Sequence, residues 1–134
     1  MSAEPVWLHD RIIEAIHMRQ LAEHGGAEGV RDHALLATAL AKPLQLHSYG
    51  DPPPDLPTLA AAYAHGIARL HPFVDGNKRT SFVAALLFLR VNGQGIYASQ
   101  EERYTTWLAL AAGELDEAKL AQWLRERLTH MESM

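Results

Sequence analysis

Near the middle of the chain, nine consecutive residues combine side chains that suit a group-transfer reaction: His71-Pro72-Phe73-Val74-Asp75-Gly76-Asn77-Lys78-Arg79. Histidine is the residue type best suited to accept a proton at physiological pH, so His71 can take one from a hydroxyl group. Asp75 provides a carboxylate in a turn, which is a hard oxygen ligand suited to Mg²⁺ that also contacts phosphate. Phe73 is a large apolar side chain in an otherwise polar loop, and we expect it to anchor that loop in the core.

The last residues of this segment lead into a helix and form a candidate phosphate site. Gly76 allows close approach of the backbone, and Asn77 is a favourable N-cap residue. The free N–H groups and partial positive charge of a helix N-terminus favour a bound phosphate. Lys78 and Arg79 disfavour the helix when they stand in its first turn, so we expect an anion between them and the N–H groups. The whole segment therefore predicts transfer of a phosphate-containing group to a hydroxyl.

The elements around this segment are predicted to be helices. Apolar residues recur at helical spacing over residues 8–22, 33–41, 59–70, 78–91, 101–112 and 115–128. Asp32 and Thr58 are the expected N-caps of the second and third helices, and Pro43 is expected to end the second. The helix after the loop is apolar on nearly every side, which is typical of a buried central helix. We therefore predict an all-α fold class, a compact helical bundle with a buried central helix that follows the active-site loop.

One long stretch, residues 44–57, lacks helical periodicity. It contains the segment Gly50-Asp51-Pro52-Pro53-Pro54, which fits neither a helix nor a central strand. Connections of this length are uncommon inside a compact domain and are often functional. Residues 94–98 are expected to form a short extended piece, and no alternating pattern is long enough to build a sheet.

Length, charge and composition exclude several classes of function. The 134 residues suit one domain spanning residues 1–134. A net charge of −4 without a basic run argues against direct nucleic-acid binding. The absence of cysteine excludes disulfides, thiolate nucleophiles and Cys-ligated metals. The most apolar stretch, residues 81–91, is too short to span a membrane. The N-terminus lacks the pattern of a signal peptide, so a cytoplasmic location is expected.

Residues 71–79 resemble the motif of the Fic/Doc family, His-x-Phe-x-Asp/Glu-Gly/Ala-Asn-x-Arg. Every fixed position of the motif is matched, and Lys78 is the variant found in the Doc (death-on-curing) branch, where other members usually have glycine. The resemblance extends over most of the chain. It includes Gly29-Val30-Arg31-Asp32, the apolar helix that follows the motif, and Ala112-Gly113-Glu114.

This resemblance implies a fold and a set of functional residues. The fold would be the small all-α Fic/Doc bundle, with His71 as the general base and Asp75 as the ligand of Mg²⁺. The phosphates of ATP would be held by Gly76, Asn77, Lys78 and Arg79. A flap that aligns the target peptide beside the site would be formed by Leu44, Gln45, Leu46, His47, Ser48 and Tyr49.

The Doc branch also implies an activity and partners. The chain would be the toxin of a type II toxin–antitoxin system and an ATP- and Mg²⁺-dependent protein kinase. It would phosphorylate a threonine or serine hydroxyl of a translation factor, elongation factor Tu by resemblance, and so halt translation. No Ser/Thr-x-x-x-Glu-Gly/Asn string is present, so inhibition is expected from a cognate antitoxin supplied as a separate chain. Because Fic members with glycine at position 78 typically transfer AMP, adenylyl transfer to a protein hydroxyl is the alternative activity.

Three readings of other classes remain open at this stage. Arg11 and His17 resemble the Arg-x(4–6)-His pattern of all-α ribonuclease toxins, although His17 is expected on a helix surface. His65 precedes His71 by six residues and could indicate a metal-dependent hydrolase, but no third ligand is evident. The chain could also be a catalytically silent antitoxin-binding module.

Overall fold

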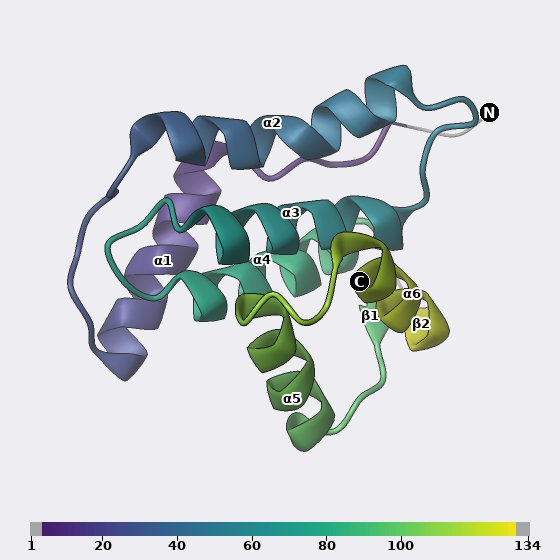
Figure 1. The fold of residues 1–134 in the computed structure, drawn as a ribbon. Coiled ribbons are helices and arrows are strands. Elements are labelled where there is room, and N and C mark those ends of the chain that lie inside the picture. Colours follow the sequence, from purple (N-terminus) through teal and green to yellow (C-terminus); the bar gives the residue numbers. More distant parts are fainter. Residues whose placement is uncertain (1–3, 131–134) are drawn as a thin grey trace.

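The computed structural model describes residues 4–130, which form six helices and two short strands (Figure 1). The elements are α1 (Asp10–His24), α2 (His33–Tyr49), α3 (Leu56–Leu70), α4 (Asn77–Val91), β1 (Gln94–Ile96), α5 (Gln100–Ala111), α6 (Glu117–Glu126) and β2 (Leu128–His130). Strands β1 and β2 pair antiparallel with Ile96 opposite Leu128, and they form the one sheet among residues 4–130. The predicted all-α class is confirmed.

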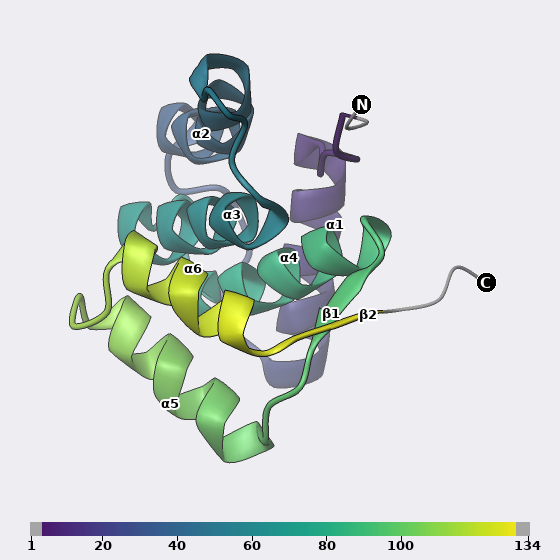
Figure 2. The same ribbon diagram turned by 90° about the vertical axis from the view of Figure 1, so that its right-hand side faces the viewer.

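Helix α3 lies at the centre of the bundle. It packs against α2, α4, α5 and α6, and α1 packs against α4. In Figure 2, α2 lies above α3, α6 and α5 lie below it, and α4 followed by α1 lies to its right. Helix α4 is also central, because every residue from position 80 to position 89 is buried or half-buried. The expectation of a buried helix after the loop is confirmed, and the helix before the loop is buried even more completely.

Side-chain caps begin most of these helices. Asp32 accepts a hydrogen bond from the backbone N–H of Leu35 and caps α2, as predicted. The prediction that Thr58 caps α3 is wrong, since Asp55 is the N-cap and accepts from the backbone N–H of Thr58. The helix begins three residues earlier than expected because proline is well tolerated in a first turn, where Pro57 lies.

The prediction that α2 ends at Pro43 is wrong. The helix continues to Tyr49 with Pro43 inside it, so the irregular connection is much shorter than predicted. Proline at position 43 removes the N–H group that would bond the carbonyl of Ala39. Gly66 of α3 lies against this turn, and a Cβ added to it would come within 3.1 Å of the Cβ of Ala39. Helix α3 therefore packs closely at Gly66 against the turn of α2 that lacks this hydrogen bond, and Pro43 itself is buried.

Ion pairs attach α6 to the rest of the bundle. The guanidinium of Arg125 donates to Asp55 at 2.7 and 3.1 Å, which links α6 to the start of α3. At the other end of α6, Lys42 donates to Glu117 at 2.6 Å. The hydrogen bond from Arg125 is the main cause that lowers the pKa of Asp55 to about 2.

Replacing Asp55 by asparagine is expected to remove a pH-dependent part of the stability. Asparagine keeps the N-cap but not the charge. In the unfolded chain the carboxyl titrates near a pKa of about 3.9, so the stabilisation is present above about pH 4 and is lost as the pH falls toward 2. Urea unfolding of the native protein and of Asp55→Asn, between about pH 7 and 2.5, measures this stabilisation. The difference in their free energies of unfolding should shrink below about pH 4, and a constant difference would contradict the assignment.

None of the helices within residues 4–130 combines the length and the apolar character needed to cross a bilayer.

Candidate active site

His71 ends α3 in the left-handed backbone conformation, with φ of 53° and ψ of 56°. Its side chain is exposed. Arg31 holds this turn from the connector between α1 and α2. Its Nε donates to the carbonyl of His71 at 2.7 Å, and its Nη2 donates to the carbonyl of Leu70 at 2.8 Å. A left-handed non-glycine residue is strained, and such strain is maintained only where neighbouring contacts fix it.

The connector also bonds the loop along its backbone. The carbonyl of Pro72 accepts from the N–H groups of Arg31 and Asp32 at 2.7 and 3.1 Å, and Val74 donates to the carbonyl of Gly29 at 3.0 Å. The segment that lies beside the candidate catalytic loop is therefore the connector at residues 29–32.

Asn77 closes the loop from the inside. Its Oδ1 accepts from the backbone N–H of Phe73, and its Nδ2 donates to the carbonyl of Phe73, both at 3.0 Å. Phe73 is only 1% exposed and belongs to the core. The prediction that Asn77 is the N-cap of α4 is wrong, because its amide is used by the loop. Gly76 takes the N-cap position with φ of 77°, which glycine adopts without strain.

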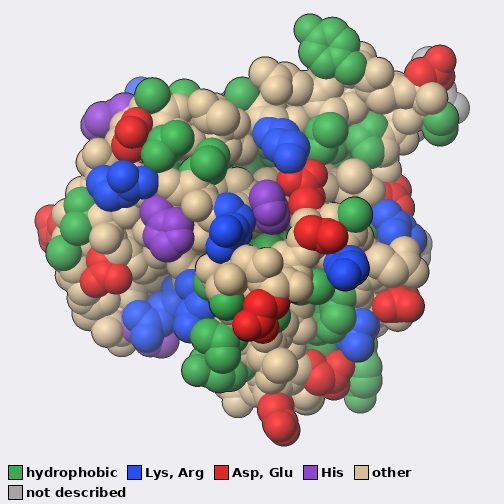
Figure 3. Space-filling view, viewed as in Figure 1, with side chains coloured by type: hydrophobic (Ala, Val, Ile, Leu, Met, Phe, Trp, Pro, Cys, Tyr) green, Lys and Arg blue, Asp and Glu red, His purple; other side chains and the backbone are tan. Residues whose placement is uncertain are grey.

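The N-terminus of α4 is consequently open. Among the described residues no side chain caps it, so N–H groups of its first turn remain available to an anion. Arg79 is exposed and Lys78 is half-buried in this same turn. On the face seen in Figure 3, several Lys, Arg and His side chains lie in the half of the molecule where α3 leads into α4, and other Lys and Arg side chains lie in the opposite half. Positive charge and free N–H groups thus coincide at the predicted phosphate site.

Asp75 presents an exposed carboxylate next to this open helix end. Its Oδ1 accepts from the N–H of Gly76 at 2.9 Å, and its Oδ2 accepts a longer bond from the N–H of Ala27 at 3.4 Å. Within residues 4–130 no group of three His, Cys, Asp or Glu side chains could enclose a metal ion. One carboxylate beside a phosphate site fits Mg²⁺, which binds through one or two carboxylates, substrate phosphates and water.

Gly26 makes the approach of the Asp75 carboxylate possible. Its φ is 125°, and a Cβ added there would come within 2.9 Å of both Asp75 Oδ2 and Leu21 Cδ2. The preceding residue, Gly25, also has a positive φ, of 79°, but an added Cβ would meet nothing within 4 Å.

The variant Gly26→Ala is therefore expected to be less stable than Gly25→Ala. Both alanines bear backbone strain of about 1–3 kcal/mol, but only the first also displaces Asp75 and Leu21. Urea unfolding of the two variants separates the steric contribution from the strain that they share. Equal free energies of unfolding would show that the Asp75 carboxylate does not depend on this contact.

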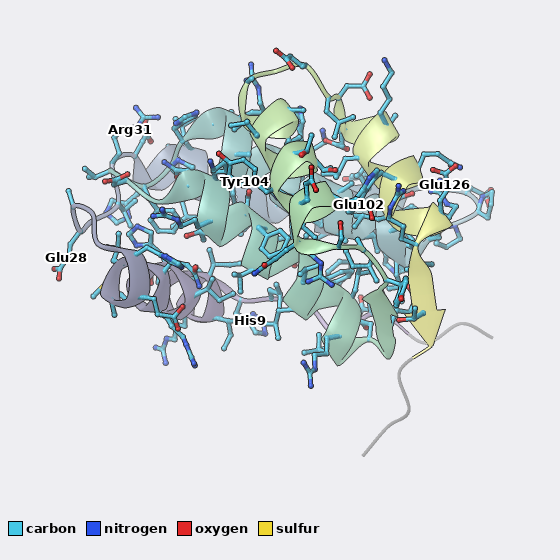
Figure 4. The ribbon with its side chains drawn as sticks, turned by 90° about the horizontal axis from the view of Figure 1, so that it is seen from below. His9, Glu28, Arg31, Glu102, Tyr104 and Glu126 are labelled. Carbon is cyan, nitrogen blue, oxygen red and sulfur yellow. The ribbon has the colours of Figure 1, made fainter. Side chains whose placement is uncertain are left out.

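Lys78 has a neighbour that its sequence position did not indicate. Its ammonium lies 5.3 Å from the ring centroid of Tyr104, which is an exposed residue of α5 (Figure 4). This distance is within the range of a cation–π interaction. The ring of Tyr104 thus holds Lys78 on the α5 side of the open helix end.

The structure does not bring the predicted flap, Leu44 to Tyr49, to this site. These residues form the last turns of α2, beside the start of α3. His71 stands at the other end of α3, and a helix of 15 residues is about 22 Å long. The prediction of a flap at residues 44–49 is therefore wrong, since the helix continues through Pro43 and carries these residues away from the loop.

A hollow of about 620 Å³ lies between α2, α3 and α6, away from the loop. It is lined by charged and polar side chains that include Lys42, His65, Glu117 and Arg125. Figure 3 shows both signs of charge intermingled at the centre of that face. Lys42 and His65 both contact Glu117, and burial lowers the pKa of His65. Because these charges neutralise one another, the loop at residues 71–79 is the better candidate for binding a nucleotide.

Two of the alternative readings are not supported by the geometry. His65 contacts Glu117 as part of the attachment of α6, and the described residues offer no further ligands for a metal-dependent hydrolase. The expectation that His17 lies on a helix surface is wrong, because the residue is only 2% exposed. A buried imidazole cannot reach RNA, so the ribonuclease reading loses one of its two residues.

Comparison with known proteins identifies relatives of the chain. A family model described as the Fic/DOC family matches residues 7–89. The chain is 50% identical to Toxin Doc of Mycolicibacterium smegmatis over 70 residues, which cover 52% of this chain and about half, 53%, of that protein's own length. It is 35% identical to Protein kinase doc of Escherichia phage P1 over 111 residues, which cover 83% of this chain and 86% of the phage protein.

Proposed function

Since the chain belongs to the Fic/Doc family, in its Doc toxin branch, we propose that it is a protein kinase that transfers the terminal phosphate of ATP to a protein hydroxyl. The observation that carries this proposal is the open N-terminus of α4. It lies next to an exposed carboxylate, Asp75, and a guanidinium, Arg79, in the loop that begins at the exposed imidazole of His71.

Gly76, Lys78 and Arg79 have roles in nucleotide binding in this proposal. The N–H groups at the start of α4 bind phosphate oxygens of the nucleotide, and Arg79 neutralises their charge. Lys78 contributes a second cation from the side of α5. Gly76 keeps the helix end accessible, because a Ser, Thr, Asp or Asn side chain at the N-cap would accept hydrogen bonds from N–H groups that the phosphates need.

His71 takes the proton of the target hydroxyl as the reaction proceeds. The hydroxyl oxygen then forms a bond to the terminal phosphorus of ATP, and the bond from that phosphorus to the bridging oxygen breaks. The products are the phosphorylated protein, ADP and a proton that His71 passes to solvent. Little covalent chemistry is required of the protein beyond this, because phosphoryl transfer depends mainly on positioning and charge stabilisation.

Asp75 is the proposed ligand of Mg²⁺. The ion, when bound, neutralises the negative charge of the phosphates. The contribution of the chain is to fix this carboxylate, which the N–H groups of Gly76 and Ala27 do.

The target and the inhibitor follow from the Doc resemblance and belong to the proposal. The target would be a threonine or serine of a translation factor, with elongation factor Tu as the first to test. The inhibitor would be a cognate antitoxin encoded as a separate chain. A protein named as a kinase among the relatives supports phosphoryl over adenylyl transfer, as does lysine at position 78.

The experiment that tests the activity uses ATP labelled separately at the α and γ phosphates, with a bacterial lysate and with purified elongation factor Tu as targets. Label transferred from the γ position, with the mass increase of one phosphate on the target, is the expected result. Label from the α position, with the mass of AMP added, would replace the kinase assignment by adenylyl transfer. No label from either position, with growth arrest unchanged in His71→Ala, would favour a catalytically silent binding module.

A further inference from the structure

His17 is a buried histidine of α1 to which the proposed chemistry assigns no role. Its side chain faces the bundle, as do those of Ile13 and Ile16, and only 2% of the residue is exposed. Burial of a polar side chain costs free energy unless it is hydrogen-bonded, so the partners of His17 indicate why it is there.

Those partners all lie in the candidate catalytic loop. Nε2 of His17 is 2.8 Å from the carbonyl oxygen of Asp75, and since a carbonyl can only accept, Nε2 carries the hydrogen. The imidazole stacks on the ring of Phe73, with centroids 3.9 Å apart and planes at 10°. Gly76 also lies against it, because a Cβ added there would be 3.7 Å from Cδ2 of His17.

The contacts of His17 come from another helix, α1, and they include Asp75, whereas Asn77 bonds the backbone of Phe73. Asn77 bonds both backbone groups of Phe73, but its side chain makes no contact that fixes the peptide of Asp75. The hydrogen bond from His17 fixes that peptide, and it spans 58 residues of sequence. The backbone that carries the proposed metal-binding carboxylate is thereby attached to α1.

We propose that His17 is a positioning residue, whose Nε2–H fixes the backbone of Asp75 and so sets the affinity of the site for Mg²⁺ and nucleotide. Only the effect on Mg²⁺ affinity rests on the proposed function, and the effect on the order of the loop does not. Groups that orient a metal ligand are worth about 10–100-fold in metal affinity or activity.

Two variants separate the hydrogen bond from the ring. His17→Phe keeps the stacking on Phe73 but removes the donor. His17→Gln loses the ring but keeps an N–H group that can reach the carbonyl of Asp75. His9→Phe is the matched control, because His9 is an exposed histidine at the far end of the same helix and makes no side-chain cap (Figure 4).

The first readout is hydrogen exchange, measured by NMR without nucleotide. The N–H groups of Phe73 and Val74 are bonded to Asn77 and Gly29, so their exchange reports on the order of the loop. His17→Phe is expected to speed their exchange about tenfold, the effect of losing one buried hydrogen bond. His17→Gln should restore most of the protection, and His9→Phe should leave it unchanged.

The second readout is the Mg²⁺ concentration that gives half-maximal phosphate transfer. His17→Phe should raise it about tenfold or more, with a smaller change in kcat at saturating Mg²⁺. Unchanged exchange in His17→Phe would overturn the proposal, as would exchange that rises equally throughout the protein. If the native protein transfers no phosphate, the proposed function fails, and the exchange data still decide the role of His17.

A measurement on the native protein covers the case in which His17→Phe does not fold. The ¹⁵N spectrum of the imidazole should show a hydrogen on Nε2 of His17 that exchanges slowly with water. A hydrogen on Nδ1 instead would be incompatible with donation to the carbonyl of Asp75, and would overturn the proposal without any variant.

Discussion

Replacing His71 by alanine is expected to lower the rate of transfer by a factor of about 10²–10⁴, the usual contribution of a general base. The side chain is exposed and packs against nothing in the core, so the folded state should survive. The loss should therefore appear in kcat, with the affinity for ATP little changed, because the phosphate site at the start of α4 is intact.

The rate is measured as label transferred from γ-labelled ATP to the target, at saturating ATP and Mg²⁺. His9→Ala is the matched control, because it removes an exposed histidine that stands away from the loop. Full activity in His71→Ala would mean that another group accepts the proton, and the assignment of the base would have to be abandoned.

Replacing Arg79 by alanine is the second large effect, expected at about 10²-fold or more in kcat/KM. The guanidinium stands in the first turn of α4, where it neutralises charge on the phosphates. A cation in a first turn opposes the helix dipole, so its removal should leave the free energy of unfolding unchanged or slightly increased.

Arg90→Ala is the control for Arg79→Ala, because both arginines are exposed and lie at opposite ends of α4. Kinetics with varied ATP, together with urea unfolding, distinguish loss of phosphate binding from loss of structure. Comparable losses of activity in the two variants would show that Arg79 acts through general charge and not at the site.

The sequence allowed the helices and the loop to be predicted because both depend on nearby residues. Apolar periodicity located all six helices, and Asp32 was recognised as a cap from its type and position alone. The end of α2 was predicted wrongly because the rule for proline is local. The close packing of Gly66 on Ala39 and the burial of Pro43 are long-range features that favour continuing the helix.

The residues of the loop, including its core anchor Phe73, could be identified from the sequence, but the distant residues that hold the loop could not. The carbonyl of His71 is bonded by Arg31, which is 40 residues away, and the carboxylate of Asp75 by the N–H of Ala27, 48 residues away. No local pattern marks such pairs. The doublet Gly25-Gly26 is a usable signal, since two glycines exceed what a helix end requires.

The prediction of the flap failed because the position of residues 44–49 also depends on long-range structure. Residues 44–49 were assigned by their position in the sequence alone, and one continuous helix was enough to move them to the opposite end of α3. In the structure the backbone that runs alongside the loop belongs to residues 29–32, through its bonds to Pro72 and Val74. A target peptide that lies beside His71 would meet this connector.

The left-handed backbone at His71 has a consequence for how the activity can be lost. Glycine adopts this conformation without steric cost, so His71→Gly would relieve strain while removing the proposed proton acceptor. Under the proposed function, this single change would give a well-folded chain without transferase activity. The stability of the fold therefore does not require histidine at position 71, and only the activity does.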